Sequence, residues 1–325
     1  MVELVCFGEA LIDFLGEPDT GTGPMRYRRY AGGAPANVAV AAARLGTPTA
    51  FAGMLSRDAF GDFLLESLRS AGVSIEYVAR TEEANTALAF VTLDPSGDRR
   101  FSFYRPPAAD LLFRSQHFKA ECFAKAKVFH VCSNSLTEAP IAAVTLEGVR
   151  RARAAGSLVS FDINLRPNLW PAEEDPGPRV WSVLREADVV KVSAAELRFL
   201  IQGLGSEAAV LKEVWQGRTR WLLITDGGSP ARQLTRHGED ILPIFPVQAV
   251  NTTGAGDAFM GGLLNRLVQE GVSPADLDRF LADGERTRQA LRFASACGAL
   301  CVTRHGAFEA MPTLPEVEAF LKRQP

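Results

Sequence analysis

Short apolar runs alternate along this chain with segments that carry helix start and stop signals, and this order constrains the fold most strongly. The apolar runs predict buried strands at 2–7, 49–55, 128–132, 158–162, 188–192, 221–225 and 246–250. Segments bounded by Pro, Asp or Gly predict helices at 35–45, 58–72, 139–155, 194–201, 207–215 and 255–270. Strands in such an order pair in parallel, because each crossover helix packs back onto a sheet face. The sequence therefore predicts an α/β fold: a mostly parallel sheet with helices on both faces and ligands at the carboxyl ends of its strands.

Two segments interrupt the alternation. Residues 87–93 and 99–104 flank the turn-rich pentapeptide 94–98, which predicts a β-hairpin. With residues 11–30, this hairpin is expected to form a small antiparallel sheet. The length of 325 residues fits one large domain with such an accessory piece. The predicted division is a main domain over 1–10, 31–86 and 105–325, and a small sheet over 11–30 and 87–104.

Composition excludes several classes of partner. Lys and Arg number 35 against 38 Asp and Glu, and no basic block could follow a nucleic-acid backbone. No apolar run approaches the ~18 residues of a membrane span, so we expect neither a nucleic-acid nor a membrane partner. The five cysteines include no C-x-x-C pair, and the N-terminus lacks a secretory pattern. These features predict a cytoplasmic protein with reduced thiols.

The stretch N-T-T-G-A-G-D-A-F-M-G-G at 251–262 opens a predicted helix and suits an anion. Glycines allow backbone N–H groups to approach a ligand, and the first turn of a helix leaves several N–H groups unpaired. Asp257 at this helix start could accept a proton from an attacking hydroxyl. Alternatively, Thr252 or Thr253 caps the helix and Asp257 only stabilises its dipole. The spacing alone leaves both interpretations open.

Two other nucleotide-binding motifs are absent from the sequence. There is no G-x-x-x-x-G-K-[ST], so a Walker-type loop does not hold the phosphates. No G-x-G-x-x-G follows the first strand, which argues against a dinucleotide-dependent dehydrogenase. Phosphate binding would therefore fall to residues 251–257.

The amino-acid sequence of 251–262 resembles the second signature of the ribokinase-like (phosphofructokinase-B type) carbohydrate kinases. A-G-G-A-P-A-N-V-A at 31–39 resembles the N-terminal signature of that family, and G-E-A-L-I-D at 8–13 its opening loop. Further similarities follow in the family's order at 193–196, 225–227 and 293–306, while 104–110 and 161–171 are similar to fructokinases within it. The resemblance implies a ribokinase-like fold in which the small sheet is a lid that covers the sugar and helps form a homodimer. A closed lid excludes water, which would otherwise compete with the sugar for ATP.

The resemblance also implies a role for individual residues. Asp257 would be the general base, aided by the backbone N–H groups of Gly254, Ala255 and Gly256. The implied sugar-binding residues are Asp13, Gly32, Gly33, Asn37, Arg105, Asn164 and Arg166. The implied nucleotide-binding residues are Lys191, Ser193, Glu196, Thr225, Gly227 and Ser295, with Glu196 also ordering water around Mg²⁺.

Several of these residues have a structural alternative. Asn37 could fill a helix-turn position, and Gly32 and Gly33 could simply form a loop. Lys191 could extend from a strand end to solvent. Ser193 and Glu196 match a capping box, which is compatible with a role in binding.

A monovalent-cation site is expected to be weak. In ribokinase an Asp that opens the signature and a Ser near the C-terminus help to bind potassium, but this sequence has Asn251 and Ala310 there. Neutral oxygens from Asn251 and from the backbone remain available. The residues implied for this site are Asn251, Thr253, Cys301 and Gly306.

The resemblance therefore implies an ATP- and Mg²⁺-dependent sugar kinase that converts D-fructose to fructose 6-phosphate. Within the same class, 2-keto-3-deoxygluconate kinase and ribokinase remain alternatives, since Arg105 or Arg166 could bind a carboxylate. From another class, a catalytically silent sugar- or nucleotide-binding regulator is possible. The intact Gly254-Ala255-Gly256-Asp257 argues against silence.

Overall fold

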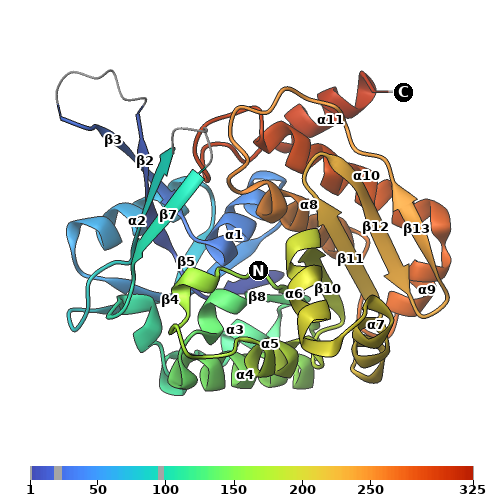
Figure 1. Cartoon of the computed structure of the whole chain (residues 1–325), viewed down its shortest axis with the longest axis horizontal. Helices are drawn as coiled ribbons and strands as arrows, with labels where there is room; N and C mark the ends of the chain where they lie inside the picture. The colour runs from blue at the N-terminus through green and yellow to red at the C-terminus, as the bar shows by residue number, and fades with distance from the viewer. Residues whose placement is uncertain (1, 18–23, 94–98, 325) are drawn as a thin grey trace.

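The computed structural model describes residues 2–17, 24–93 and 99–324, so the turn expected at 94–98 lies outside the described residues. Two sheets organise this part of the chain (Figure 1). The larger sheet has nine strands in the order β13-β12-β11-β10-β9-β8-β1-β4-β5. Its strands are β1 Leu4–Phe7, β4 Thr49–Ser56, β5 Ser74–Thr81, β8 Val128–Cys132, β9 Leu158–Asp162, β10 Val189–Ser193, β11 Trp221–Asp226, β12 Ser229–Thr235 and β13 Gly238–Leu242.

Neighbouring strands from β5 to β11 are all parallel, which confirms the predicted α/β class. Three differences from the prediction concern strands. The sequence analysis missed β5, and it missed β12 and β13, which extend the sheet edge as an antiparallel hairpin. The strand expected at 246–250 is wrong, because these residues form neither helix nor strand. Pro243 and Pro246 remove backbone donors there, and the N–H of Val250 instead bonds the carbonyl of Val302 after a helix.

Side-chain alternation along the strands produces two cores. On β1, Leu4 and Cys6 belong to one buried cluster and Val5 and Phe7 to the other. The first cluster packs under α1 Ala34–Arg44, α2 Ala59–Ser70, α8 Ala255–Gln269, α9 Leu277–Ala282, α10 Gly284–Cys301 and α11 Leu314–Lys322. The second packs under α3 Glu121–Ala124, α4 Ala139–Ala154, α5 Gly177–Leu184, α6 Ala194–Leu204 and α7 Glu207–Gln216. Helices therefore cover both faces, as predicted.

The smaller sheet projects from one end of the molecule (Figure 1) and has the order β3-β2-β6-β7. Its strands are β2 Leu11–Gly16, β3 Tyr27–Gly32, β6 Leu88–Leu93 and β7 Arg99–Tyr104. The β2–β3 and β6–β7 pairs are antiparallel hairpins, whereas β2 and β6 pair in parallel. The sheet is thus mixed and not wholly antiparallel, because β2 and β6 are joined through a long crossover.

The two faces of this small sheet differ. Leu11 and Ala89 pack in a small buried cluster on one face of the sheet. Phe14 and Phe90 stack on the opposite face, with Tyr104 edge-on to Phe90. Phe14 also meets Phe60 of α2, which ties the small sheet to the main domain.

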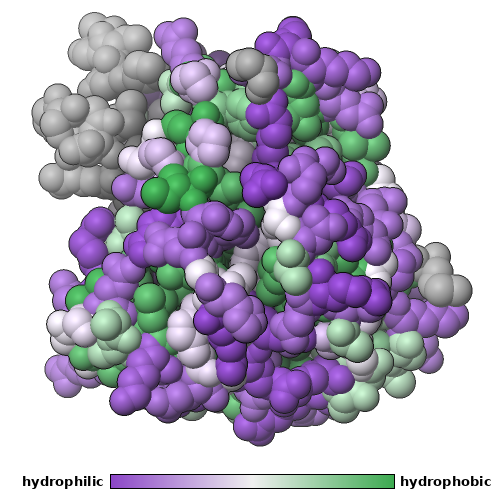
Figure 2. Space-filling model, turned by 90° about the vertical axis from the view of Figure 1, so that its right-hand side faces the viewer, coloured by the Kyte–Doolittle hydropathy of each residue, from purple (hydrophilic) through white to green (hydrophobic). Residues whose placement is uncertain are grey.

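The face of the molecule in Figure 2 carries mainly hydrophilic side chains, with hydrophobic ones in smaller separate areas. Among the described residues, no helix combines the length and apolar character that a bilayer span requires.

Candidate active site

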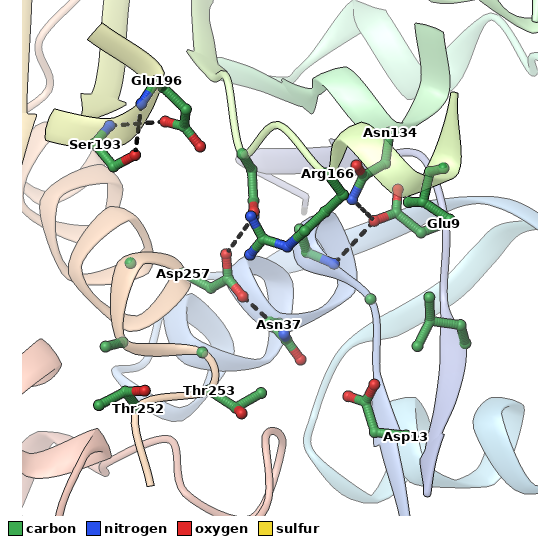
Figure 3. Close-up of a pocket in the computed structure, with 18 of the residues that line it drawn as sticks. Glu9, Asp13, Asn37, Asn134, Arg166, Ser193, Glu196, Thr252, Thr253 and Asp257 are labelled. Carbon is green, nitrogen blue, oxygen red and sulfur yellow. Dashed lines mark hydrogen bonds between the residues drawn. The ribbon is translucent and has the colours of Figure 1, made fainter. Parts of the chain in front are cut away.

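A cavity of about 480 Å³ lies where the small sheet meets the carboxyl ends of the parallel strands. The small sheet contributes Asp13 and Phe103, the end of β10 contributes Lys191, and the first turn of α8 contributes Asp257. Open α/β sheets bind ligands at this edge, because strand ends and helix N-termini converge there. Figure 3 shows the labelled polar side chains turned toward this cavity from several elements.

The first turn of α8 is arranged to bind an anion. Gly254 is the N-cap residue at φ +78°, and no side chain caps the helix. A Cβ on Gly254 would come within 3.1 Å of Met311 Cε, and the positive φ itself favours glycine. Neither Thr252 nor Thr253 therefore serves as the cap that the alternative interpretation required. Gly254, Ala255 and Gly256 line the cavity, so the N-terminal dipole of α8 acts on it, while the N–H of Ala255 lies 3.4 Å from the carbonyl oxygen of Thr252.

Asp257 is buried in the first turn of α8 and is held by two amides. Asn37 Nδ2 donates to its Oδ2 at 2.7 Å, and Asn164 Nδ2 donates to Oδ1 at 3.1 Å. Burial, with added repulsion from Asp162, raises the pKa of Asp257 to about 7. A carboxylate with this pKa can accept a proton near neutral pH, as a general base must. Asn164 itself has φ +42°, an uncommon backbone conformation that occurs here at the site.

Asp13 reaches the same cavity from the small sheet. Burial, followed by repulsion from Asp257, raises the pKa of Asp13 to about 7, while the Arg166 guanidinium opposes the shift. Two glycines make room for this arrangement. A Cβ on Gly32 would lie 2.2 Å from Asp13 Oδ2, and one on Gly33, at φ +104°, would lie 2.6 Å from the Glu9 carbonyl. The Gly-Gly pair is thus required by packing at the site, although only Gly33 lines the cavity.

Lys191 is buried and does not extend to solvent. Its Nζ contacts both carboxylate oxygens of Asp162, at 2.9 and 2.8 Å. Burial opposes the charge of Lys191, but Asp162 and Glu196 outweigh it and raise its pKa. A Cβ on Gly256 would lie 2.9 Å from Nζ, so this cation lies directly beside the first turn of α8. It adds positive charge where a phosphoryl group would bind.

Arg105 is the sugar-binding candidate that the structure places elsewhere. Its guanidinium is buried outside the cavity, where it bonds Asp110 at 2.6 Å and Thr137 at 3.1 Å. A buried ion pair holds it there, since an unpaired buried charge is costly. Arg105 immediately follows β7, so it anchors the end of the small sheet in the main domain. Arg166, by contrast, lines the cavity and lies near both Asp13 and Asp257 (Figure 3).

The expected capping box at the start of α6 is present. Ser193 Oγ accepts from the N–H of Glu196 at 3.2 Å, and Glu196 Oε2 accepts from the N–H of Ser193 at 2.7 Å. Glu196 Oε1 also accepts from the N–H of Leu165 at 2.9 Å. Both residues line the cavity, as does Thr225, whereas Gly227 and Ser295 do not. Of the residues implied to bind the nucleotide, four line the cavity and two lie outside it.

The described residues hold no cluster of three or more His, Cys, Asp or Glu side chains suited to bind a metal directly. This donor set fits Mg²⁺, because that ion usually stays partly hydrated and is bound through substrate phosphates with one or two carboxylates. Glu196, the carboxylate implied for this role by the sequence, lines the cavity, and each of its two oxygens already accepts one backbone N–H.

The candidates for a monovalent-cation site lie next to the α8 turn. Asn251 is buried, and its Oδ1 accepts from the N–H of Thr253 at 2.8 Å. Cys301 Sγ lies 3.6 Å from the carbonyl oxygen of Thr253. Gly306 has φ +98°, and neither it nor Asn251 lines the main cavity. The Asn251 oxygen therefore already carries one hydrogen bond within the loop.

Two buried polar residues of the cavity were missed by the sequence analysis. Glu9 Oε1 accepts from the N–H of Ala34 at 3.1 Å and from Asn134 Nδ2 at 2.9 Å. Both Glu9 and Asn134 line the cavity. The available signal was an acidic residue two positions after a buried strand, at the sheet edge where ligands bind. Asn134 follows β8 in the same way.

Comparison with known proteins gives consistent results. Residues 1–314 match the family described as pfkB family carbohydrate kinase. The chain is 39% identical to Fructokinase-2 of Oryza sativa subsp. japonica over 324 residues, which is 98% of this chain and 94% of that protein. The crystal structure of a fructokinase with bound ATP from Xylella fastidiosa is similar with a TM-score of 0.96 and 52% identity, covering 99% of this chain and 98% of that one. A double mutant of the Vibrio cholerae O395 fructokinase, in a form with bound fructose, ADP and potassium ion, gives a TM-score of 0.86 at 31% identity, covering 99% and 98%.

Proposed function

This chain belongs to the pfkB family of carbohydrate kinases, and from this premise we propose that it phosphorylates D-fructose to fructose 6-phosphate with ATP. The observation that carries the proposal is the position of Asp257, a buried carboxylate in the uncapped first turn of α8 with a pKa near 7. The fructokinases of Oryza sativa and Xylella fastidiosa support fructose as the sugar, and the ATP bound to the latter supports the donor.

The reaction follows from the geometry of the cavity. Asp257 accepts the proton of the primary hydroxyl while that oxygen forms a bond to the γ-phosphorus of ATP. The bond between the γ-phosphorus and the β–γ bridging oxygen breaks, and ADP leaves with the released electron pair. The N–H groups of Gly254, Ala255 and Gly256 stabilise charge on the transferring group, and Lys191 adds its positive charge beside them.

Asp13, Gly33 and Asn37 bind sugar hydroxyls in this proposal, with Asn164 and Arg166 beside them. Ser193, Glu196 and Thr225 are on the nucleotide side, and Gly227 and Ser295 would contact the nucleotide beyond the cavity. Glu196 would hold Mg²⁺ through water, and this ion would offset phosphate charge when bound. A weak potassium site at Asn251, Thr253, Cys301 and Gly306 completes the set.

The small sheet acts as the lid in this proposal, because it supplies Asp13 and Phe103 to the cavity. It is also the proposed contact between two copies of the chain. Met25, shortly before β3, and Tyr104 at the end of β7 are exposed by 52% and 67%. Light scattering tests this point: a homodimer that Tyr104→Asp converts to monomer would support it, and a monomeric wild type would refute it. A cytoplasmic location also remains a prediction.

A coupled ADP-release assay tests the function. The panel is fructose, 2-keto-3-deoxygluconate, ribose, mannose, glucose and adenosine, each with ATP and Mg²⁺. We expect the highest kcat/KM for fructose. A higher value for the keto acid would replace the substrate and keep the kinase, whereas no turnover with any sugar would favour a silent binding protein.

A further inference from the structure

Three buried oxygen atoms on the cavity residues have no hydrogen-bond partner within the described chain. They are Glu9 Oε2, Asn37 Oδ1 and Asn134 Oδ1. All three residues line the same cavity. A buried polar atom without a partner lowers stability, so a group of three in one cavity indicates a ligand that supplies the missing donors.

The partners of each side chain determine which atom remains unpaired. Asn37 donates its Nδ2 to Asp257, and Asn134 donates its Nδ2 to Glu9 Oε1. A flipped amide would bring two oxygens together in either place, so these hydrogen bonds fix the amide orientation. The unpaired amide atoms are therefore carbonyl oxygens, which only accept hydrogen bonds.

Glu9 and Asn134 come from neighbouring strand ends. Glu9 follows β1 and Asn134 follows β8, and these strands pair in parallel in the sheet. Glu9 Oε1 is already occupied by the N–H of Ala34 and by Asn134, which fixes the carboxylate against the start of α1. Figure 3 shows Glu9 and Asn134 together, apart from the Ser193–Glu196 pair.

We propose that Glu9 and Asn134 form a hydroxyl-recognition subsite, which accepts hydrogen bonds from sugar hydroxyls other than the one that is phosphorylated. This inference rests on the proposed sugar kinase function and extends it to specificity. Two acceptor oxygens favour a neutral polyhydroxyl substrate. They disfavour a deoxy sugar, which lacks a donor, and a carboxylate, which Glu9 repels.

The protonation state of Glu9 determines whether its Oε2 accepts or donates a hydrogen bond. Burial raises the pKa of Glu9, and the Arg105 guanidinium behind it opposes the shift. A protonated Glu9 would donate from Oε2, where the ionised form accepts. A test variant must therefore distinguish a hydrogen-bond acceptor from a hydrogen-bond donor at the position of Oε2.

Glu9→Gln makes that separation. Its side-chain oxygen can keep both present hydrogen bonds, while an NH₂ group replaces the unpaired Oε2. Asn134→Leu removes the second acceptor at similar size. Ser133→Ala is the matched control, because the Ser133 hydroxyl is also buried without a partner in the described chain but does not line the cavity.

The experiment compares kcat/KM for fructose with that for 1-deoxy-, 3-deoxy- and 4-deoxyfructose in wild type and each variant. Loss of a buried hydrogen bond should lower fructose kcat/KM about 10-fold in Glu9→Gln and in Asn134→Leu, with the KM for ATP unchanged. At least one deoxy sugar should show a similar loss in wild type and no further loss in the matching variant, as a direct contact requires. Ser133→Ala should match wild type throughout.

Three results would overturn the subsite. Fructose kinetics of Glu9→Gln equal to wild type would mean that Glu9 donates or makes no contact. A lower fructose kcat/KM in both variants, with no loss for any of the deoxy sugars in wild type, would mean that water fills these positions. Independent, additive losses from the residue and hydroxyl deletions would mean that the two do not touch. If wild type prefers another sugar, the fructose assignment fails, and the deoxy derivatives of that sugar provide the same test.

Discussion

The side-chain amide of Asn37 donates a hydrogen bond to the carboxylate of Asp257 at 2.7 Å, although 220 residues separate them. Asn37 lies in the first half of α1, and Asp257 lies in the first turn of α8. These two helices pack side by side, and a Cβ on Gly261 of α8 would lie 2.4 Å from Ala41 Cβ of α1. Close helix packing thus fixes a sugar-binding candidate against the proposed base.

Replacing the base tests its role most directly. Asp257→Asn should leave the fold and ATP binding nearly intact and lower kcat at least ~10²-fold, because the hydroxyl proton loses its acceptor. Steady-state turnover with fructose and binding of ATP by calorimetry are the measurements. A variant with more than about a tenth of wild-type kcat would show that Asp257 only stabilises the helix dipole.

Activity should depend on the ionisation of Asp257. Burial and then Asp162 raise its pKa to about 7, and only the ionised form accepts a proton. We therefore expect kcat/KM for fructose to rise with pH through about 7 and to reach a plateau above it. A profile measured at constant ionic strength checks this. A flat profile between pH 5.5 and 8.5 would contradict the assignment, provided that ATP saturates the enzyme throughout.

Loss of the Asn37 amide should affect sugar use more than nucleotide use. Asn37→Ala removes a buried hydrogen bond worth ~1–3 kcal/mol, so kcat/KM for fructose should fall roughly 5- to 150-fold. The KM for ATP should change little, because Asn37 is expected to contact the sugar and not the nucleotide. Asp13→Asn should behave similarly. Equal losses for fructose and ATP would instead indicate a general disturbance of the site.

Potassium should stimulate the enzyme only weakly. Asn251 is neutral, and its Oδ1 already accepts from the N–H of Thr253, so the strongest attraction for a cation is missing. We expect activity without sodium or potassium, a rise of a few-fold on adding potassium, and a larger response in Asn251→Asp. A wild type that is inactive without potassium and saturates at low millimolar concentration would mean that backbone carbonyls suffice.

Sequence reasoning succeeded where local pattern and long-range structure agree. The strand–helix alternation predicted the parallel sheet, and the glycines around Asp257 marked the start of α8. It failed where tertiary contacts decide. The segment 246–250 reads as an apolar strand, but the backbone of Val250 pairs with the end of α10. Arg105 reads as a surface cation near the substrate, but Asp110, only five residues later, holds it in the interior. Glu9 and Asn134 carry no spacing signal, since only the sheet brings them together.

The parallel pairing of β2 with β6 has a consequence for the order of folding. Each hairpin of the small sheet can form from local contacts, but Ile12 meets Leu88 only after α1, β4, α2 and β5 have brought the two hairpins together. Closing so long a loop is entropically costly, and pairings distant in sequence form late. The amide of Ile12, which bonds the Ala87 carbonyl at 3.0 Å, should therefore gain protection later than the amides of β4 in pulse-labelled hydrogen exchange during refolding. Simultaneous protection would contradict this order. If the small sheet forms late, Asp13 is also placed late. The ability to bind sugar would therefore be among the last properties that a newly made chain acquires.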